Sequence, residues 1–319
     1  MSGPLVLEED LRLGIVLGGG TRERVLDLAP RIEAAGFDSL WVGDHISFHI
    51  PLLESLTLLT FASAVTQTIR LGTAVYLLPL RHPTTSAKVI STLDNLSGGR
   101  LTLGIGVGGE FPPEFEACGI PLNERGSRTD EAIEILRKLF SEDRVEHRGK
   151  HFEFGPISIN PKPLQAGGPP ILVGGRKGPS MRRAGRVGDG YISHMCSPEF
   201  FASNLADIAK HAEEAGRKDV PFETLSFIFT IVDDDYEVAQ ARAAKMLGTI
   251  YNTDFSEASK KYCLLGRAED CLEQMQRFVD AGARRFVLSP LMDPDAVLEV
   301  AESRILPELG NLKIPESAP

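Results

Sequence analysis

The feature that most constrains the fold is a regular alternation of apolar, strand-like runs with amphipathic, helical runs along the whole chain. Eight strand-like runs occur, and at least one helical run follows each of them. They span residues 11–19, 37–45, 69–79, 100–109, 169–175, 188–193, 223–232 and 283–290. Alternation of this kind predicts a parallel sheet with crossover helices.

Eight such units in 319 residues favour a (β/α)8 TIM barrel that forms one domain over residues 1–319. Two insertions are expected. The first follows the fourth strand and contains a helix over 125–141 and a small hairpin over 145–154. The second follows the seventh strand, with a helix over 235–251 and an irregular segment over 252–267. A doubly wound sheet is the rival architecture, but the strands do not divide into two similar halves, so we prefer the barrel.

Composition narrows the class of protein. Apolar residues make up 42% and charged residues 24% of the chain, which is ordinary for a soluble globular enzyme. The formal charge of −10 argues against binding to nucleic acid or to an anionic membrane surface. The N-terminus has no signal-peptide pattern, no apolar run is long enough for a membrane span, and the four cysteines form no C-x-x-C pair. We therefore expect a reduced, cytoplasmic protein.

The segment "GIGVGGE" at 104–110 contains the pattern G-x-G-x-x-G, which marks dinucleotide-binding sites when it follows a strand and opens a helix. The strand is present, but Pro112 and Pro113 follow closely and predict a loop. We therefore interpret the glycines as the end of the fourth barrel strand, where a flat ligand can approach the backbone. Glu110 would then stand at the barrel mouth, unless it is only a solvated loop carboxylate.

The second strand-like run ends in "WVGDHISFH", which places Asp44 and His45 at the same C-terminal face. A histidine can donate or accept a proton near neutral pH, and a neighbouring carboxylate can hold its ring. The alternative is a helix-capping Asp44 beside an exposed His45. His45 and His49 also have a metal-ligand spacing, but Pro51 argues against a regular helix there and no third ligand group is evident. We therefore expect no metal site.

Two more strand ends carry basic residues. The fifth run is followed by "GGRK" at 174–177 and then by a helix, so free N–H groups and two cations could bind an anion such as a cofactor phosphate. A plain helix-capping turn with solvated charges is the alternative. Beyond the third run, Arg81 and His82 either reach the barrel mouth or lie on the surface.

Taken together, these segments resemble the luciferase-like monooxygenase superfamily, and the resemblance covers nearly the whole chain in the right order. The matching pieces are "GFDSLWVGDH", "IRLGTAVYLLPLRHP", "LDNLSGGRLTLGIGVGGE", "NERGSRTDEAIEILRKLF", "GKHFEF", "PPILVGG", "AGRVGDGY" and "GRAEDCLEQMQRFVDAGARRFVL". The resemblance implies a TIM barrel that binds FMN or the deazaflavin coenzyme F420 and usually forms a homodimer.

The deazaflavin-dependent branch of that family implies specific site residues. Its Asp-His pair after the second strand matches Asp44 and His45, and its glutamate after the fourth strand matches Glu110. Its non-proline cis peptide in the third strand matches the bond Ala74–Val75. The cofactor-binding set implied by the resemblance is Asp44, Thr73, Ala74, Val75, Gly108, Gly109, Gly174, Gly175, Arg176 and Lys177.

From these residues we expect hydride transfer between coenzyme F420 and a small organic substrate. His45 would act as acid or base, oriented by Asp44 and partnered by Glu110. The segment "FPPEF" after the fourth strand differs from the sugar-phosphate dehydrogenase branch, which favours a more apolar substrate pocket. One alternative is an FMN-dependent monooxygenase supplied by a separate reductase. Another is a flavin-binding protein without catalysis, although such a protein needs no acid–base residues.

Overall fold

The computed structural model describes residues 4–18, 20–291 and 293–315. Contacts between residues divide the chain into two compact units. The first unit comprises Met1–Gly18, Arg31–Trp41 and Gly175–Pro319, and the second comprises Gly19–Pro30 and Val42–Gly174. The helix α1, Arg22–Ala34, contributes to both.

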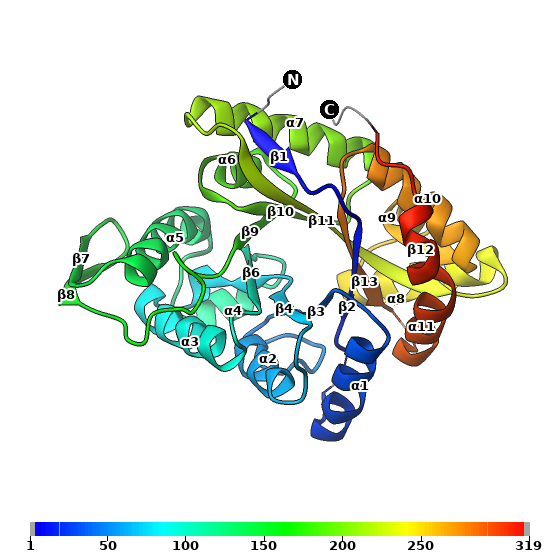
Figure 1. Cartoon of the computed structure of the whole chain (residues 1–319), viewed down its shortest axis with the longest axis horizontal. Helices are drawn as coiled ribbons and strands as arrows, with labels where there is room; N and C mark the ends of the chain where they lie inside the picture. Colours follow the sequence, from blue (N-terminus) through cyan, green and yellow to red (C-terminus); the bar gives the residue numbers. More distant parts are fainter. Residues whose placement is uncertain (1–3, 19, 292, 316–319) are drawn as a thin grey trace. The chain divides into compact units, whose positions relative to one another are not determined.

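The first unit contains parallel strands that show how the sheet closes. They are β1 (Leu5–Leu7), β2 (Arg12–Val16), most of β3 (Ser39–Val42), β10 (Gly190–His194), β11 (Val220–Val232), β12 (Cys263–Gly266) and β13 (Arg285–Pro290). The last barrel strand, β13, pairs in parallel with the first, β2, and also with β11 (Figure 1). Pairing of the first strand with the last closes a barrel, so the predicted (β/α)8 TIM-barrel class is confirmed.

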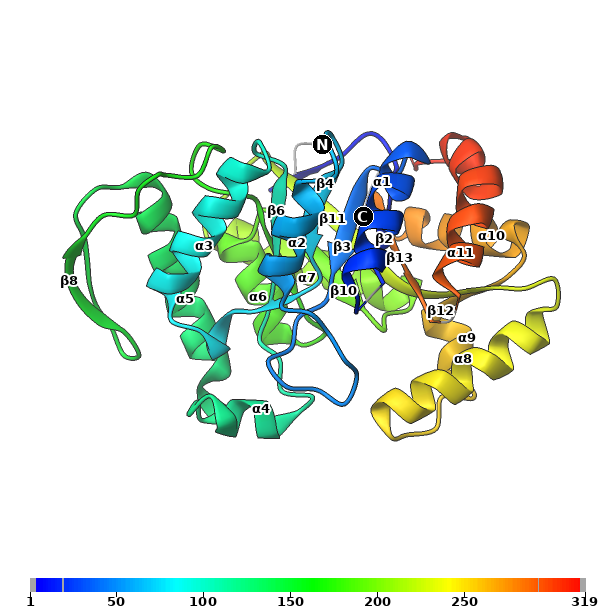
Figure 2. The same ribbon diagram turned by 90° about the horizontal axis from the view of Figure 1, so that it is seen from below.

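Helices follow these strands as the sequence pattern predicts. They are α6 (Gly178–Val187), α7 (Pro198–Glu214), α8 (Tyr236–Tyr251), α9 (Ala258–Tyr262), α10 (Ala268–Asp280) and α11 (Pro294–Val300), with short π and 3₁₀ turns at Ala301–Ile305 and Leu306–Asn311. In α10, Cys271, Met275, Phe278 and Val279 fall on one face at helical spacing, and all four are buried. The insertion after β11 packs α8 against α9 and β12 (Figure 2).

The second unit contains β4 (Arg70–Thr73), β5 (Tyr76–Leu77), β6 (Leu101–Gly106) and β9 (Ile171–Gly174). Strand β6 pairs in parallel with β4 and β5 on one side and with β9 on the other. Its helices are α2 (Ser55–Ser63), α3 (Pro83–Leu96), α4 (Pro112–Ala117) and α5 (Arg125–Ser141). The predicted hairpin is present as antiparallel β7 (Val145–Arg148) and β8 (Glu153–Ile157), on the outer side of α3 and α5 (Figure 2).

Two local predictions are wrong. The segment after the glycine run is a short helix, α4, because Pro112 and Pro113 occupy its first turn, where a missing N–H costs nothing. The segment 252–267, expected to be irregular, contains α9 and the four-residue strand β12. Insertions after the fourth and seventh barrel strands, β6 and β11, are confirmed.

The hairpin in the insertion after β6 is held by one carboxylate. Glu131 of α5 lies 3.0 Å from His147 Nε2 and accepts hydrogen bonds from the backbone N–H groups of His151 and Phe152. Burial alone would raise the pKa of Glu131, but these hydrogen bonds together lower it. A Cβ at Gly149 would lie 2.1 Å from Glu131 Oε1, so only glycine lets the hairpin approach this closely.

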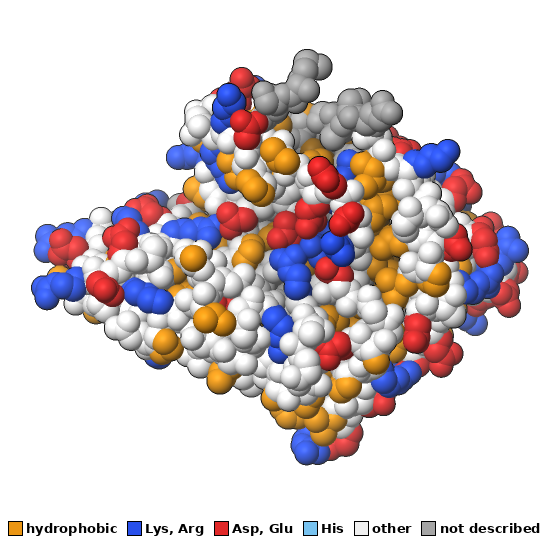
Figure 3. Space-filling view, viewed as in Figure 1, with side chains coloured by type: hydrophobic (Ala, Val, Ile, Leu, Met, Phe, Trp, Pro, Cys, Tyr) orange, Lys and Arg blue, Asp and Glu red, His pale blue; other side chains and the backbone are white. Residues whose placement is uncertain are grey.

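The remaining observations on the fold concern surface charge and the burial of the cysteines. Basic and acidic side chains are intermixed over the face shown in Figure 3. Among the described residues, no helix combines the length and the apolar character needed to cross a bilayer. All four cysteines are free; Cys118 is half-buried, and the others are buried. Burial raises the pKa of the Cys196, Cys263 and Cys271 thiols to about 12.

Candidate functional site

Polar side chains gather in the second unit where β3 ends. Strand β3 ends at Val42, and Gly43, Asp44 and His45 follow directly. The loop that they open runs to α2, and α4 lies at the same end of the unit (Figure 2). In barrels, active sites lie at the carboxyl ends of the strands, so this is the face on which the predicted acid–base residues belong.

Asp44 is almost fully buried, with 3% of its surface exposed, and its carboxylate accepts four hydrogen bonds. Arg81 donates two of them in a fork, with distances of 2.6 and 2.8 Å. Ser55 Oγ donates a third at 3.0 Å, and the backbone N–H of Leu77 donates a fourth at 2.9 Å. Burial alone would lower the pKa of Arg81, but its hydrogen bonds to Asp44 and the charge of that carboxylate raise it.

The partner of His45 is a residue that sequence analysis missed. His45 Nδ1 lies 3.1 Å from both carboxylate oxygens of Glu114 on α4, and the neighbouring backbone N–H of Ile46 donates to the same carboxylate at 3.2 Å. Glu114 is fully buried, whereas Glu110 is exposed. The predicted contacts are therefore wrong in two respects: the oxygens of Asp44 are used by other donors, and Glu114 takes the place expected for Glu110.

The position of Glu114 follows from how α4 is anchored. Phe115, its neighbour, packs with Leu77 and Leu80 in a small buried cluster. Gly108 makes room for this contact, because an added Cβ would lie 3.2 Å from both the Phe115 ring and Leu77. A proline pair followed by one acidic and one apolar residue was the available signal: it opens a helix whose first turn carries the carboxylate.

The ring of His45 is fixed on its face as well as at one nitrogen. Phe48 stacks on it, with ring centroids 4.1 Å apart and planes 6° from parallel. Phe111 in turn meets the Phe48 ring edge-on at 5.8 Å. Since Nδ1 faces Glu114, Nε2 is the ring nitrogen left for chemistry. Within the part of the chain that the structure describes, Nε2 makes no hydrogen bond, and the side chain is 20% exposed.

The predicted cis peptide Ala74–Val75 is present. It follows Thr73, whose hydroxyl donates to a backbone carbonyl of β6 at 2.8 Å. The Val75 side chain lies against the last residues of two other strands, Gly106 and Gly174. A Cβ would come within 2.2 Å of Val75 Cγ2 at Gly106 and within 2.7 Å of Cγ1 at Gly174. These two strands must therefore end in glycine for Val75 to occupy its place.

The remaining glycines of the run serve the turn into α4. Gly108 and Gly109 have φ values of +61° and +114°, which favour glycine. A Cβ at Gly109 would also lie 2.9 Å from Arg125 Nε. Gly106 and Gly109 of the pattern G-x-G-x-x-G are thus explained by close packing against Val75 and by the turn. The approach of a flat ligand to these glycines stays a prediction.

In the first unit, the loop that enters α6 carries the predicted phosphate-binding residues. Arg176 and Lys177 are exposed, and the Lys177 carbonyl accepts a hydrogen bond from Ser180 N at 2.8 Å. A Cβ at Gly175 would lie 2.2 Å from Ser180 Oγ. The turn thus leaves two cations at a helix N-terminus, an arrangement that suits an anion. Binding of a phosphate there stays a prediction.

His194, at the end of β10, is another residue that sequence analysis missed. It lies opposite Phe227 in the register of β10 and β11, and its Nε2 is 3.3 Å from the Tyr251 hydroxyl. Its ring also meets those of Phe227 and Phe229, at 5.6 and 5.4 Å. Burial and, to a smaller extent, the charge of Arg176 lower the pKa of His194 to about 4, so it is neutral at physiological pH.

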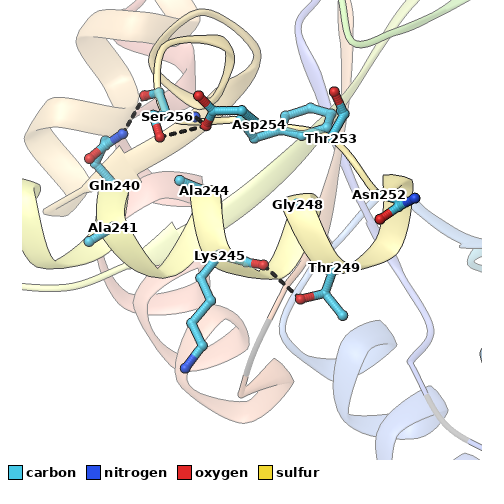
Figure 4. A pocket seen from close by; sticks show the side chains of 11 residues that line it. Gln240, Ala241, Ala244, Lys245, Gly248, Thr249, Asn252, Thr253, Asp254 and Ser256 are labelled. Atoms are coloured by element: carbon cyan, nitrogen blue, oxygen red, sulfur yellow. Dashed lines mark hydrogen bonds between the residues drawn. The ribbon is translucent and has the colours of Figure 1, made fainter.

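Another groove is found elsewhere in the first unit. It has a volume of about 830 Å³ and lies between α8 and the loop that follows it (Figure 4). Its polar groups bond to one another: Gln240 Nε2 donates to the Ser256 carbonyl at 2.6 Å, and Ser256 Oγ donates to Asp254 at 2.6 Å (Figure 4). These bonds hold the loop, so we assign the groove no part in the chemistry.

Comparison with known proteins gives a family match over most of the chain. A family model described as luciferase-like monooxygenase matches residues 10–285. An F420-dependent glucose-6-phosphate dehydrogenase of Nakamurella multipartita is 27% identical over 316 residues, which cover 90% of this chain and 92% of that protein.

Solved structures share the fold at lower sequence identity. An F420-dependent secondary alcohol dehydrogenase in complex with an F420–acetone adduct has a TM-score of 0.83 at 22% identity, and the match covers 93% of this chain and 98% of that one. A monooxygenase from Streptomyces bottropensis has a TM-score of 0.82 at 24% identity, and the match covers 93% of this chain and 99% of that one.

Proposed function

This chain belongs to the luciferase-like monooxygenase family, and we propose that it is an oxidoreductase that transfers a hydride between coenzyme F420 and a small organic substrate. The family consists of oxidoreductases and monooxygenases, F420-dependent enzymes among them. A relative that matches nearly the whole chain is named as F420-dependent, which supports this cofactor over FMN.

Each unit, taken by itself, offers a feature that suits one part of F420, either its flat ring or its phosphate-bearing tail. Strands β6 and β9 end in glycines against which Val75 packs, so no side chain from those two positions blocks a planar group. Arg176 and Lys177 are exposed cations beside a helix N-terminus and suit a phosphate. Coenzyme F420, when bound, supplies the carbon centre that accepts or gives the hydride.

The observation that carries the proposal is the set of contacts made by the His45 ring. One ring nitrogen faces a fully buried carboxylate and an aromatic ring covers one face, while the other nitrogen makes no hydrogen bond to any residue that the structure describes. Such a ring can take a proton from a substrate hydroxyl or return it to a carbonyl oxygen, which hydride transfer to or from that carbon requires. A protein that only stores a flavin needs no such group.

The segment "FPPEF" at residues 111–115 supports a more apolar substrate than a sugar phosphate, because it carries no basic side chain. The proposal therefore differs in substrate from the relative in Nakamurella multipartita, which is named as a glucose-6-phosphate dehydrogenase.

An FMN-dependent monooxygenase is the second candidate. It is supported by the similarity in fold to the monooxygenase from Streptomyces bottropensis. In that case, a separate reductase would supply reduced FMN, and His45 would act as the acid beside it.

The test of the proposal is turnover of F420 by a His45→Ala variant. Reduction of oxidised F420 is followed by its absorbance with a panel of small alcohols, and its reverse with the matching carbonyl compounds. We expect at least a ~10²-fold lower kcat for the variant, with F420 affinity within a few-fold of wild type. His211→Ala, on α7, is the matched control and should behave as wild type. Turnover by His45→Ala at the wild-type rate would refute the assigned role.

A further inference from the structure

We propose that Glu114 is a positioning residue that fixes His45 in the tautomer with the proton on Nδ1, so that the lone pair stands on Nε2. The inference deepens the proposed function, because it states which nitrogen exchanges the substrate proton. The tautomer itself can be measured whether or not F420 is the cofactor.

The geometry at the carboxylate carries the first step. His45 Nδ1 is equally far, 3.1 Å, from Oε1 and Oε2 of Glu114. This symmetric fork suits one N–H shared between two acceptor oxygens. A protonated carboxyl would instead point its single hydrogen from one oxygen and give unequal contacts.

The second step comes from the neighbouring backbone. Ile46 N–H donates to Glu114 Oε2, and a backbone N–H can only donate, so this oxygen acts as an acceptor. Glu114 has no exposed surface, so water cannot supply further donors. A buried carboxylate requires donors, and His45 Nδ1–H is the remaining one within reach among the described contacts of Glu114.

The third step is the contrast with Asp44, the carboxylate next to His45 in the sequence. Asp44 accepts from Arg81, Ser55 and the Leu77 backbone, and these four hydrogen bonds fill its oxygens. Asp44 therefore anchors the loop, whereas Glu114 determines the state of the imidazole. Phe48, stacked on the ring, keeps its plane in line with the carboxylate.

The consequence for chemistry is direct. With Nδ1 protonated, Nε2 would accept the proton of a substrate hydroxyl, while the hydride of the same carbon would go to the deazaflavin of the proposed function. The resulting imidazolium is then paired with the Glu114 carboxylate. Loss of the carboxylate frees the other tautomer, which presents an N–H on Nε2 and cannot accept that proton.

The test is nitrogen NMR of the protein with ¹⁵N-labelled histidine, recorded without cofactor at alkaline pH. The chain has seven histidines, and the His45→Asn variant assigns the His45 signals. We expect a protonated Nδ1 and an unprotonated Nε2 in wild type. Glu114→Gln should lose this preference, and Glu116→Gln, an exposed site on the same helix, should keep it. A wild-type His45 protonated on Nε2, or an unchanged tautomer in Glu114→Gln, would overturn the proposal.

Kinetics provide a second readout. Glu114→Gln should lower kcat by a factor of ~10²–10⁴ with KM and F420 affinity nearly unchanged, and Glu114→Asp should recover part of the loss. Equal loss of F420 binding would assign a structural role instead. If Glu114→Gln fails to fold, the wild-type spectrum alone tests the proposal, because a His45 with an unprotonated Nδ1 contradicts it. Lack of F420 binding by wild type would remove the proposed function but leave the NMR result standing.

Discussion

The contact between Val75 and Gly106 predicts a large and specific effect of a single methyl group. In Gly106→Ala, the new Cβ would lie 2.2 Å from Val75 Cγ2, whereas carbon atoms normally stay about 3.5–4.0 Å apart. Gly106 does not have a positive φ, so the cost comes from the clash alone. Overpacking of this kind costs about 1–3 kcal/mol of unfolding free energy.

A second substitution, Val75→Ala, should relieve the clash that Gly106→Ala creates. Val75→Ala removes both γ-methyl groups and leaves its Cβ 3.2 Å from the new methyl of Gly106→Ala. Alone, Val75→Ala should cost about 1–2 kcal/mol, at about 0.8 kcal/mol for each buried carbon removed. In the double variant the added methyl fills the vacated space, so its stability should lie within about 1 kcal/mol of Val75→Ala.

The assay is urea unfolding followed by circular dichroism for the four proteins of the cycle. Gly43→Ala is the control, because its Cβ would have no atom within 4 Å. We expect a coupling energy of about 1–3 kcal/mol between positions 75 and 106. The packing argument would be refuted if the two substitutions lowered the free energy of unfolding additively. It would also be refuted if Gly106→Ala unfolded with a free energy within about 0.5 kcal/mol of wild type.

Three further predictions concern charge and burial. Arg81→Met leaves the buried Asp44 carboxylate without its charged partner and should cost about 3–5 kcal/mol in urea unfolding; a loss below about 1 kcal/mol would contradict this. His194 has a pKa of about 4, below the unfolded value of 6.5, so its contribution to stability is complete above pH 6.5. That contribution falls by up to about 3 kcal/mol as the pH drops from 6.5 to about 4, because the unfolded chain then binds a proton that the folded His194 does not. The thermal midpoint of His194→Gln should therefore depend less steeply on pH, and an equal slope would count against the assignment. Cys118 should be the first thiol to react with Ellman's reagent in the native protein, since the other three are buried; rapid labelling of two or more thiols would be inconsistent with that burial.

Much of the fold could be predicted because its signals are local. The helix at 125–141 and the hairpin at 145–154 are found where the periodicity placed them. The two wrong predictions, for β12 and for α4, also have local causes. The strand β12 is only four residues long, too short for a clear pattern, and a proline pair is compatible with both a loop and the first turn of a helix.

For the candidate site, the sequence predicted the place of Asp44 and His45 at a strand end better than it predicted their contacts. The end of β3 located Asp44 and His45, because barrel chemistry concentrates at strand ends. The partner of His45 depends on where the Phe115 anchor places α4, which spacing along the chain does not reveal. Glu110 and Glu114 are only four residues apart, but burial separates them completely: the first is exposed and the second is fully buried.

The central claim is that the site binds a deazaflavin for hydride transfer, and a binding comparison tests it most directly. Purified protein would be titrated with oxidised coenzyme F420 and, separately, with FMN, and fluorescence quenching would be recorded. We predict saturable binding of F420 at least tenfold tighter than any binding of FMN. Tight binding of FMN with no response to F420 would contradict the claim and favour the monooxygenase. Binding of neither would contradict the cofactor roles proposed for the surroundings of Val75 and, separately, for the loop at Arg176.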